Sequence, residues 1–87
     1  MYFEYDYEKS ISNKKKHGID FEEAKDLWND NWGVVFPARS SDESRWFLIA
    51  IRDDVHWTAI FTVRNELIRI ISVRRSRKEE KAIYEKK

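Results

Sequence analysis

The sequence predicts an α+β fold, in which an antiparallel β-sheet is preceded by two N-terminal helices and followed by one C-terminal helix, in the order β-α-α-β-β-β-β-α. Helical spacing and capping signals are confined to residues 6–28 and 76–84, whereas residues 34–74 hold apolar segments separated by short turns. A chain of 87 residues supports one small core, so one domain over residues 1–87 is expected.

The N-terminal segment predicts a short edge strand and a first helix. Residues 2–5 have the composition of a strand, and Asp6 can cap a helix that runs to about His17. The basic last turn of this helix suits its negative end, and Gly18 suits the left-handed position beyond it. Both ends of the helix are therefore marked in the sequence.

A second helix is predicted directly after Gly18. Asp20 and Glu23 are spaced as a capping box, in which each side chain accepts a hydrogen bond from the backbone of the other residue. Apolar side chains then recur at helical spacing, at Phe21, Ala24, Leu27 and Trp28. We expect this face to pack on the sheet.

Four strands are predicted after the second helix, over residues 34–36, 46–51, 55–64 and 67–74. Residues 37–44 are polar and contain the sole proline, which predicts a loop. Residues 46–51 are apolar on both faces, as in a central strand covered on both sides, whereas residues 55–64 alternate more clearly.

Two short turns and a final helix complete the predicted elements. Asp53-Asp54 and Asn65-Glu66 are the predicted turns. Ser76 and Glu79 are spaced as a further capping box, so we expect the chain to close with a helix through Tyr84.

The turn at Asn65-Glu66 also predicts a strand register. A two-residue hairpin loop pairs Arg64 with Leu67, Thr62 with Arg69, Ile60 with Ile71 and Trp57 with Arg74. Arg64, Thr62 and Arg69 then share one face of the sheet. Arg74 falls on the other face or at the sheet end, unless a bulge or a longer loop changes the parity.

Basic side chains are concentrated toward the C-terminal end of the chain. Residues 1–63 hold 8 basic and 12 acidic side chains, a balance of −4, whereas residues 64–87 hold 9 basic and 4 acidic ones, a balance of +5. This asymmetry predicts a basic face for nucleic acid or an acidic partner, or else a solvated C-terminal helix. The arginines of residues 69–74 extend from an apolar strand, which suits them to a planar anion such as phosphate.

Composition excludes several classes of protein. The chain has no cysteine, so disulfides and thiolate metal sites are excluded and a reducing cytosol is compatible with it. It lacks a leader-like N-terminus and an apolar run of about 20 residues, so a cytoplasmic protein without membrane contact is expected. The two histidines and scattered carboxylates show no ligand spacing, so neither a metal nor a cofactor is predicted.

Several short motifs recur in an order that points to a known family. They are Phe3 and Asp6, Asn13 with Lys16-His17-Gly18, Phe21-Glu22-Glu23-Ala24, Arg45, Thr62 with Arg64, and Arg69-Ile70-Ile71-Ser72-Val73-Arg74 with Glu80 and Tyr84. In these motifs the chain resembles the BrnT family, the toxin half of the BrnT–BrnA type II toxin–antitoxin systems of bacteria. It departs from the family pattern at Val73, at Ser76-Arg77 and at Ile51-Arg52, positions that affect packing and capping more than charge.

The resemblance implies a RelE-like fold and a metal-independent endoribonuclease that inhibits translation. It also implies neutralisation by a DNA-binding antitoxin of the BrnA type, in a heterotetramer of two toxins and two antitoxins that reaches operator DNA only through the antitoxin. The alternative is a non-catalytic basic module that binds an antitoxin and assembles an operon-repressing complex.

Cleavage of RNA without a metal needs a group that takes the 2′-hydroxyl proton, cations near the phosphorus and a proton donor for the leaving oxygen. His17 is our candidate acid or base, because histidine changes charge near neutral pH, although a histidine here also stabilises a helix end without any chemistry. Lys16 either holds a phosphate or is one of three solvated lysines.

Three arginines are the predicted phosphate and transition-state contacts. Arg64 and Arg69 are expected on one sheet face and Arg74 at the strand end; the alternative for each is an ion pair with a nearby glutamate. Glu80 acts either as a base or by orienting Arg74 through a bidentate pair, and we favour orientation.

Further substrate contacts are expected from Arg45, Thr62, Arg75 and Tyr84, although Tyr84 is equally suited to anchor the last helix. His56 is expected to be an ordinary hydrogen-bonded or exposed histidine. At least three of the four tryptophans are expected to pack in the core rather than stack on bases.

Overall fold

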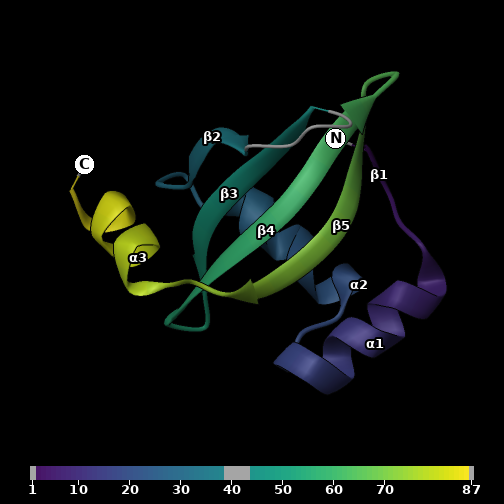
Figure 1. Cartoon of the computed structure of the whole chain (residues 1–87), viewed down its shortest axis with the longest axis horizontal. Coiled ribbons are helices and arrows are strands. Elements are labelled where there is room, and N and C mark those ends of the chain that lie inside the picture. The colour runs from purple at the N-terminus through teal and green to yellow at the C-terminus, as the bar shows by residue number, and fades with distance from the viewer. Residues whose placement is uncertain (1, 39–43, 87) are drawn as a thin grey trace.

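The computed structural model describes residues 2–38 and 44–86, and the α+β class and the predicted order of elements are confirmed within them (Figure 1). In chain order, the elements are β1 (Tyr2–Glu4), α1 (Tyr7–His17), α2 (Phe21–Ala24), the 3₁₀ helix η1 (Lys25–Asn29), β2 (Val34–Ala38), β3 (Arg45–Arg52), β4 (Val55–Arg64), β5 (Leu67–Arg75) and α3 (Lys78–Glu85).

The five strands form one mixed sheet with the order β1-β5-β4-β3-β2. The four strands β2 to β5 are antiparallel, but β1 runs parallel to β5, so the prediction of a wholly antiparallel sheet is wrong at this edge. The reason is connectivity. A two-residue turn forces neighbouring strands to run antiparallel, whereas β1 and β5 lie far apart in sequence and no turn sets their relative direction.

Helices α1, α2 and η1 cover one face of the sheet, which we call the helix-covered face (Figure 1). The main core lies there and is built from buried apolar side chains of both layers: Ile19, Phe21, Ala24, Leu27, Leu48, Ala50, Trp57, Ala59, Phe61, Ile68, Ile70 and Val73. The opposite face, which carries Phe47, Ile60 and Ser72, is called the open face. Helix α3 packs at one end of the open face through Glu80 and Tyr84.

Both predicted ends of α1 are confirmed. The Asp6 carboxylate accepts hydrogen bonds from the backbone N–H groups of Glu8 at 2.9 Å and Lys9 at 3.2 Å. Gly18 adopts φ +83° and its N–H donates to the carbonyl of Lys14 at 2.9 Å. A residue with a Cβ is strained in this left-handed conformation, which explains why glycine follows the helix.

The predicted second helix is only partly correct. Its capping box is present, since the N–H of Glu23 donates to the Asp20 carboxylate at 2.7 Å and the N–H of Asp20 donates to the Glu23 carboxylate at 2.9 Å. After Ala24, however, the chain tightens into the 3₁₀ helix η1. Side chains three residues apart eclipse one another in a 3₁₀ helix, which places Ala24 and Leu27 together in the core.

Both predicted hairpin turns are confirmed. Asp53, Asp54, Asn65 and Glu66 all adopt positive φ, between 49° and 67°, as the two-residue turns of twisted hairpins require. Arg64 pairs with Leu67 as predicted.

The predicted register holds only for the first part of the β4–β5 hairpin. Thr62 pairs with Arg69, but a β-bulge follows, so Ile60 pairs with Ser72 instead of Ile71. Beyond the bulge, Arg74 pairs with Thr58 rather than Trp57. The extra residue changes the parity of the strand and brings Arg74 onto the open face.

Helix α3 begins one residue later than the predicted capping box requires. Its N-cap is Arg77, whose N–H donates to the Glu80 carboxylate at 2.8 Å, so the prediction of a Ser76–Glu79 box is wrong. The Ser76 hydroxyl is buried and lies 2.8 Å from the hydroxyl of Thr58 instead. This tertiary contact removes Ser76 from the helix end.

The predicted loop over residues 37–44 is also corrected in part. Pro37 and Ala38 belong to β2, an edge strand that tolerates a proline because its outer N–H needs no partner. Residues 39–43 lie outside the described residues. No helix in the described part of the chain is both long and apolar enough to cross a membrane.

Candidate functional site

Three arginines of β4 and β5 lie on the open face of the sheet. Arg69 and Arg74 stand on β5 opposite Thr62 and Thr58, and Arg64 ends β4 on the same face. Thr62 and Thr58 are four residues apart, so the two β5 arginines are separated by roughly 13 Å at about 3.3 Å per residue. The bulge is the reason that the set includes Arg74.

Arg74 is held in a fixed orientation by Glu80. Its two terminal nitrogens donate to the two carboxylate oxygens at 2.8 and 2.9 Å, so the bidentate pair favoured above is present. This hydrogen-bonded pair raises the pKa of Arg74. The guanidinium carbon also lies 5.8 Å from the centre of the Phe47 ring. Charge and ring together fix the direction in which this cation points.

Glu80 is itself saturated with hydrogen bonds. Besides Arg74, it accepts a hydrogen bond from the Thr58 hydroxyl at 2.9 Å and from the Arg77 N–H at 2.8 Å. Burial raises the pKa of Glu80, but the hydrogen bonds from Arg74, Arg77 and Thr58 outweigh that effect and lower it to about 2. A carboxylate in this state is charged at neutral pH and is a poor base, so the geometry suits orientation of Arg74.

Arg69 is held more loosely than Arg74. A terminal nitrogen of Arg69 lies 3.6 Å from a Glu4 carboxylate oxygen, at a site where both side chains are about one-third exposed. Thr62, opposite Arg69, is only 5% exposed, so it forms part of the floor beneath the arginine. Arg64 is exposed next to the hairpin turn.

Asn13 closes the edge of β5 beyond the short strand β1. Since β1 pairs with β5 only as far as Arg69, the backbone of Val73 has no strand beside it on that edge. The Asn13 amide nitrogen donates to the Val73 carbonyl at 2.8 Å, and the Val73 N–H donates to the Asn13 amide oxygen at 3.2 Å. A further bond from the Asn13 amide nitrogen to the Ile19 carbonyl, at 2.8 Å, fixes the same side chain.

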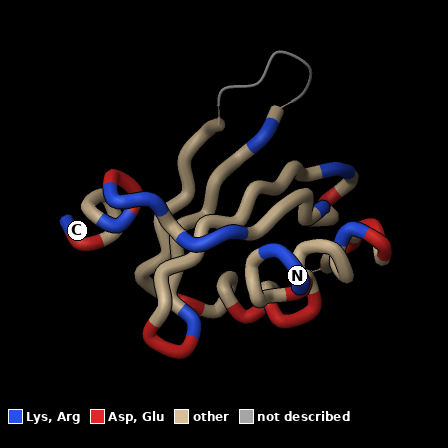
Figure 2. Tube along the Cα trace, turned by 60° about the horizontal axis from the view of Figure 1, so that its bottom comes forward, with Lys and Arg blue, Asp and Glu red and all other residues tan. Residues whose placement is uncertain are grey.

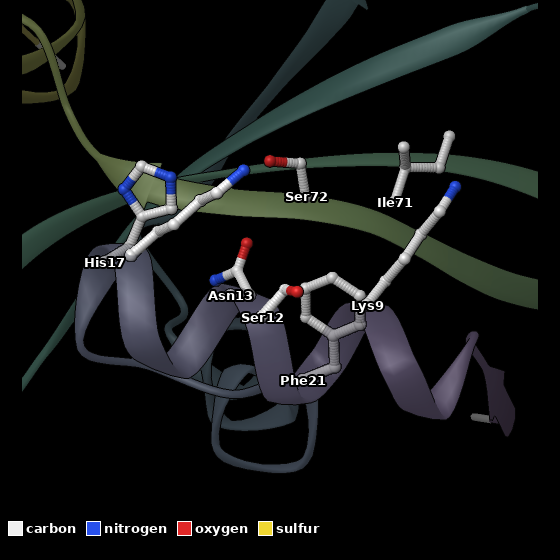
Figure 3. Close-up of a pocket in the computed structure, with 8 residues that line it drawn as sticks. Lys9, Ser12, Asn13, His17, Phe21, Ile71 and Ser72 are labelled. Carbon is white, nitrogen blue, oxygen red and sulfur yellow. The ribbon is translucent and has the colours of Figure 1, made fainter.

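A groove of about 320 Å³ lies between α1 and this edge of β5, and we call it the edge groove. Its lining residues are Lys9, Ser12, Asn13, Lys16, His17, Phe21, Ile71 and Ser72. Figure 3 shows Lys9 and His17 reaching from α1 toward β5 at the two ends of the groove. Lys16 and His17, both predicted site residues, therefore share a cavity with the bulged part of β5.

Ser72 joins the edge groove to the open face. It lines the groove, and it pairs with Ile60 on the open face between Arg69 and Arg74. The groove cations and the arginines thus adjoin along β5. The candidate site therefore combines the open-face arginines with a groove that contains two lysines and a histidine.

The other predicted substrate contacts lie apart from this junction. Arg45 opens β3 opposite Ala38 and is partly buried. Arg75 pairs with Trp57 on the helix-covered face, and its guanidinium carbon lies 5.6 Å from the Trp57 ring centre.

Tyr84 lies one helical turn beyond Glu80 and anchors α3. Its hydroxyl donates to the Asp30 carboxylate at 2.8 Å, and its ring meets that of His56 edge-to-face at 5.2 Å. Burial, followed by the hydrogen bond to Asp30, raises the pKa of Tyr84 to about 12. His56 lies 2.8 Å from Glu85, as expected for an ordinary hydrogen-bonded histidine.

The tryptophans are used mainly for packing. Trp57 is buried in the core and Trp28 and Trp46 pack against it, whereas Trp32 is 67% exposed. The prediction that at least three of the four pack in the core is confirmed.

The edge groove also contains Lys9, Ser12 and Ser72, to which the sequence alone assigned no role. Lys9, Ser12 and Lys16 follow the i, i+3, i+7 spacing of one helix face, so the spacing alone was a usable signal. Ser72 stands in the family motif over residues 69–74, but its place in the groove depends on the meeting of α1 and β5 and is not visible in the local sequence.

Basic residues cluster on one part of the molecule, whereas elsewhere lysines and arginines lie beside carboxylates, as in the pairs Lys14–Glu23 and Arg52–Asp26. Figure 2 shows basic residues along the end of β5 and the start of α3, and acidic residues at the β3–β4 turn and around α2. Over residues 2–38 and 44–86, no group of three or more histidine and carboxylate side chains is placed to hold a metal ion.

The open face carries an arginine oriented by Glu80 beside a groove lined by Lys9, Lys16 and His17, and such a surface is chemically suited to binding anions. The comparison with protein families then identifies the chain more closely. A family model described as the ribonuclease toxin BrnT of type II toxin–antitoxin systems matches residues 5–80, so the chain belongs to the BrnT family. A comparison with curated proteins finds no significant match.

Proposed function

We propose that this protein is a metal-independent endoribonuclease that inhibits translation in the bacterial cytoplasm, with residues 1–87 forming one RelE-like toxin domain. The observation that carries the proposal is the junction at Ser72, where the groove with Lys16 and His17 adjoins the face with Arg69 and Arg74. Family membership supports ribonuclease activity in general.

The proposed reaction is attack of the RNA 2′-hydroxyl oxygen on the adjacent phosphorus. A bond forms from the 2′-oxygen to phosphorus, and the bond from phosphorus to the 5′-oxygen of the next nucleotide breaks. One proton leaves the 2′-hydroxyl and one reaches the departing 5′-oxygen, and His17 is the candidate for one of these transfers. The developing negative charge is stabilised by Arg74 and Arg69, with Arg64 and Lys16 holding neighbouring phosphates.

Glu80 is proposed to act on the reaction through Arg74. A guanidinium with two nitrogens committed to a carboxylate cannot rotate freely, so its remaining N–H groups are pre-aimed. Thr62 is proposed to form part of the surface beneath Arg69. Arg45, Arg75 and Tyr84 are proposed as peripheral substrate contacts.

The proposed partner is a DNA-binding antitoxin of the BrnA type. Membership in a type II toxin–antitoxin family supports an antitoxin partner. We propose a heterotetramer of two toxins and two antitoxins, in which operator DNA is contacted only by the antitoxin. The arginines of the open face suit an acidic segment of that partner.

The test is incubation of the purified protein with end-labelled single-stranded RNA in the presence of a metal chelator. Arg74→Lys keeps the charge next to Glu80 but loses the bidentate fork, and is expected to lower the rate by roughly 100-fold. Arg52→Lys is the matched control, because it makes the same exchange at an arginine on β3 that pairs with Asp26 and has no proposed role in the reaction. It should cleave at nearly the wild-type rate, and circular dichroism should show both variants folded.

Two other results would change the proposal. Intact RNA with every protein, followed by cleavage when ribosomes are added, would place the reaction on translating ribosomes. Intact RNA under both conditions, together with co-purification of an antitoxin and no growth arrest on expression, would support the non-catalytic binding module.

A further inference from the structure

A row of four cross-strand neighbours traverses the open face from the β2 edge to the edge groove. Phe36 pairs with Phe47, Phe47 with Ile60, and Ile60 with Ser72. Directly paired residues point to the same face, so the four side chains form one line perpendicular to the strands. Three steps between strands of about 4.8 Å each give this row a length of roughly 14 Å.

The far end of the row is aromatic. The rings of Phe36 and Phe47 meet edge-to-face with their centres 5.2 Å apart, and both side chains remain partly exposed. Phe36 stands on an edge strand, whereas its neighbour Val35 points to the opposite face. The pair therefore presents ring surface on the same face as the arginines.

The aromatic pair is also coupled to the proposed phosphate site. The Arg74 guanidinium carbon lies 5.8 Å from the Phe47 ring centre, and Glu80 fixes that guanidinium. A phosphate bound by Arg74 thus lies next to the aromatic pair. The nucleotide attached to such a phosphate has its base within reach of Phe36.

We propose that Phe36, supported by Phe47, is a stacking platform for an unpaired base of the substrate, and that the RNA strand runs along the row from the edge groove to the β2 edge. This inference rests on the proposed function and specifies its substrate as single-stranded RNA read without sequence preference. Every base has a π-face, and sheets with exposed aromatic side chains are a general means of stacking two or three bases. The bases of a duplex are already stacked and paired, so duplex RNA cannot use this platform.

The test uses a short single-stranded RNA with 2′-O-methyl groups, which block cleavage, and one 2-aminopurine base. Binding is measured by anisotropy, and stacking by the change in 2-aminopurine fluorescence. Phe36→Leu keeps an apolar side chain but removes the ring, and we expect roughly tenfold weaker binding and loss of the fluorescence change. Phe36→Trp should retain both signals, and Val35→Ala is the control on the same strand and the opposite face.

A substrate variant makes the test independent of protein folding. An otherwise identical RNA with an abasic position in place of the 2-aminopurine should bind wild-type protein about as weakly as the intact RNA binds Phe36→Leu. If both changes leave binding unaltered while Arg74→Lys still slows cleavage, the platform is absent and the ribonuclease proposal stands. If Phe36→Leu weakens only binding of the antitoxin, the aromatic pair belongs to a protein interface and the inference is overturned.

Discussion

Asn13 shows how one side chain can replace part of a strand. Its amide presents a donor and an acceptor to the Val73 backbone, as the peptide groups of a neighbouring strand would do. Because the same amide nitrogen also donates to the Ile19 carbonyl, Asn13 ties the chain after α1 to the sheet. An asparagine suits this position because it carries both kinds of hydrogen-bonding group in one plane.

Replacing Asn13 should therefore destabilise the whole fold. Asn13→Ala leaves buried backbone groups of Val73 and Ile19 without partners, and we expect the free energy of unfolding to fall by about 2–3 kcal/mol. Urea unfolding of this variant measures the loss. Ser12→Ala, an exposed position on the same helix, should change stability by less than about 0.5 kcal/mol. Equal stability of the two variants would show that water replaces the amide.

Glu80 should make stability depend on acid pH. Its pKa in the folded protein is about 2, against an ordinary value of 4.5. A carboxylate whose pKa is lowered by folding stabilises the protein fully above the unfolded pKa and loses that contribution as the pH falls through the folded pKa. We expect a contribution on the order of 2 kcal/mol that disappears between about pH 4.5 and about pH 2.

The measurement is urea unfolding of wild type and Glu80→Gln across that range. The stability difference between the two proteins should shrink as the pH falls, since protonation makes the wild-type side chain neutral as well. A difference that stays constant from pH 6 to about pH 2 would mean that the Arg74 pair does not lower the pKa of Glu80.

At the scale of the element, the β-bulge on β5 decides which face carries Arg74. Local pattern predicted the turn at Asn65-Glu66 and the pairs nearest to it, because turn geometry fixes the register there. It did not predict the bulge, since Ile70 and Ile71 are both apolar and fit either register equally well. Where two apolar residues are adjacent in a strand, the sequence therefore does not predict which face of the sheet the following side chains occupy.

The bulge can be tested by changing the length of β5. Deleting Ile71 leaves Ser72 opposite Ile60 and Arg74 opposite Thr58, so the variant should fold with a modest loss of about 1 kcal/mol. Inserting an alanine after Ile71 should instead turn Arg74 to the helix-covered face and leave Glu80 buried without its partner, at a cost of about 3 kcal/mol or more.

Thermal unfolding and RNA cleavage distinguish these two variants. The deletion should keep both the cooperative transition and the Arg74-dependent activity, and the insertion should lose both. Retention of activity by the insertion variant would show that Arg74 reaches the site from either face.

Helix boundaries were predictable where local capping decides them and not where tertiary contacts compete. Asp6 and Gly18 delimit α1 as predicted, because each acts on its own neighbours. Ser76 is a good helix cap in isolation, but its hydroxyl is engaged by Thr58, eighteen residues earlier in the chain. A contact over that distance leaves no trace in the local sequence.

At the scale of the whole molecule, the cluster of basic residues at the end of β5 and the start of α3 (Figure 2) should make RNA binding strongly dependent on salt. Counterions released from a single strand give a slope of about −0.7 in log K against log salt for each phosphate that is neutralised. Arg69→Ala should reduce the slope by about 0.7, whereas Phe36→Leu should weaken binding without changing it. Anisotropy titrations at salt concentrations from about 50 to about 300 mM measure the affinity and the slope for each variant.

The salt experiment also separates two kinds of contact. If Phe36→Leu reduces the slope of log K against log salt as much as Arg69→Ala does, the Phe36 ring acts by positioning a cation and not by stacking. A slope near zero for the wild-type protein would argue against phosphate contacts altogether.

The candidate site was predictable only in part, because segments far apart in the sequence assemble it. The arginines of β5 could be chosen from sequence because they share one strand, and Lys16 and His17 because they match a family motif. Their junction at Ser72 could not, since it depends on α1 packing beside a strand that begins fifty residues later. Global topology, and not local propensity, assembles these groups.

The parallel pairing of β1 with β5 has a consequence for the order in which a ribosome makes this protein. Synthesis proceeds from the N-terminus, so β1 is made first and waits for its neighbour until Leu67 to Arg69 have been added. Arg74 and the Glu80 that orients it are made later still. A nascent chain interrupted after β4 therefore carries neither a finished sheet edge nor the oriented arginine, and the proposed cutting surface cannot exist on the ribosome until Glu80 has been added.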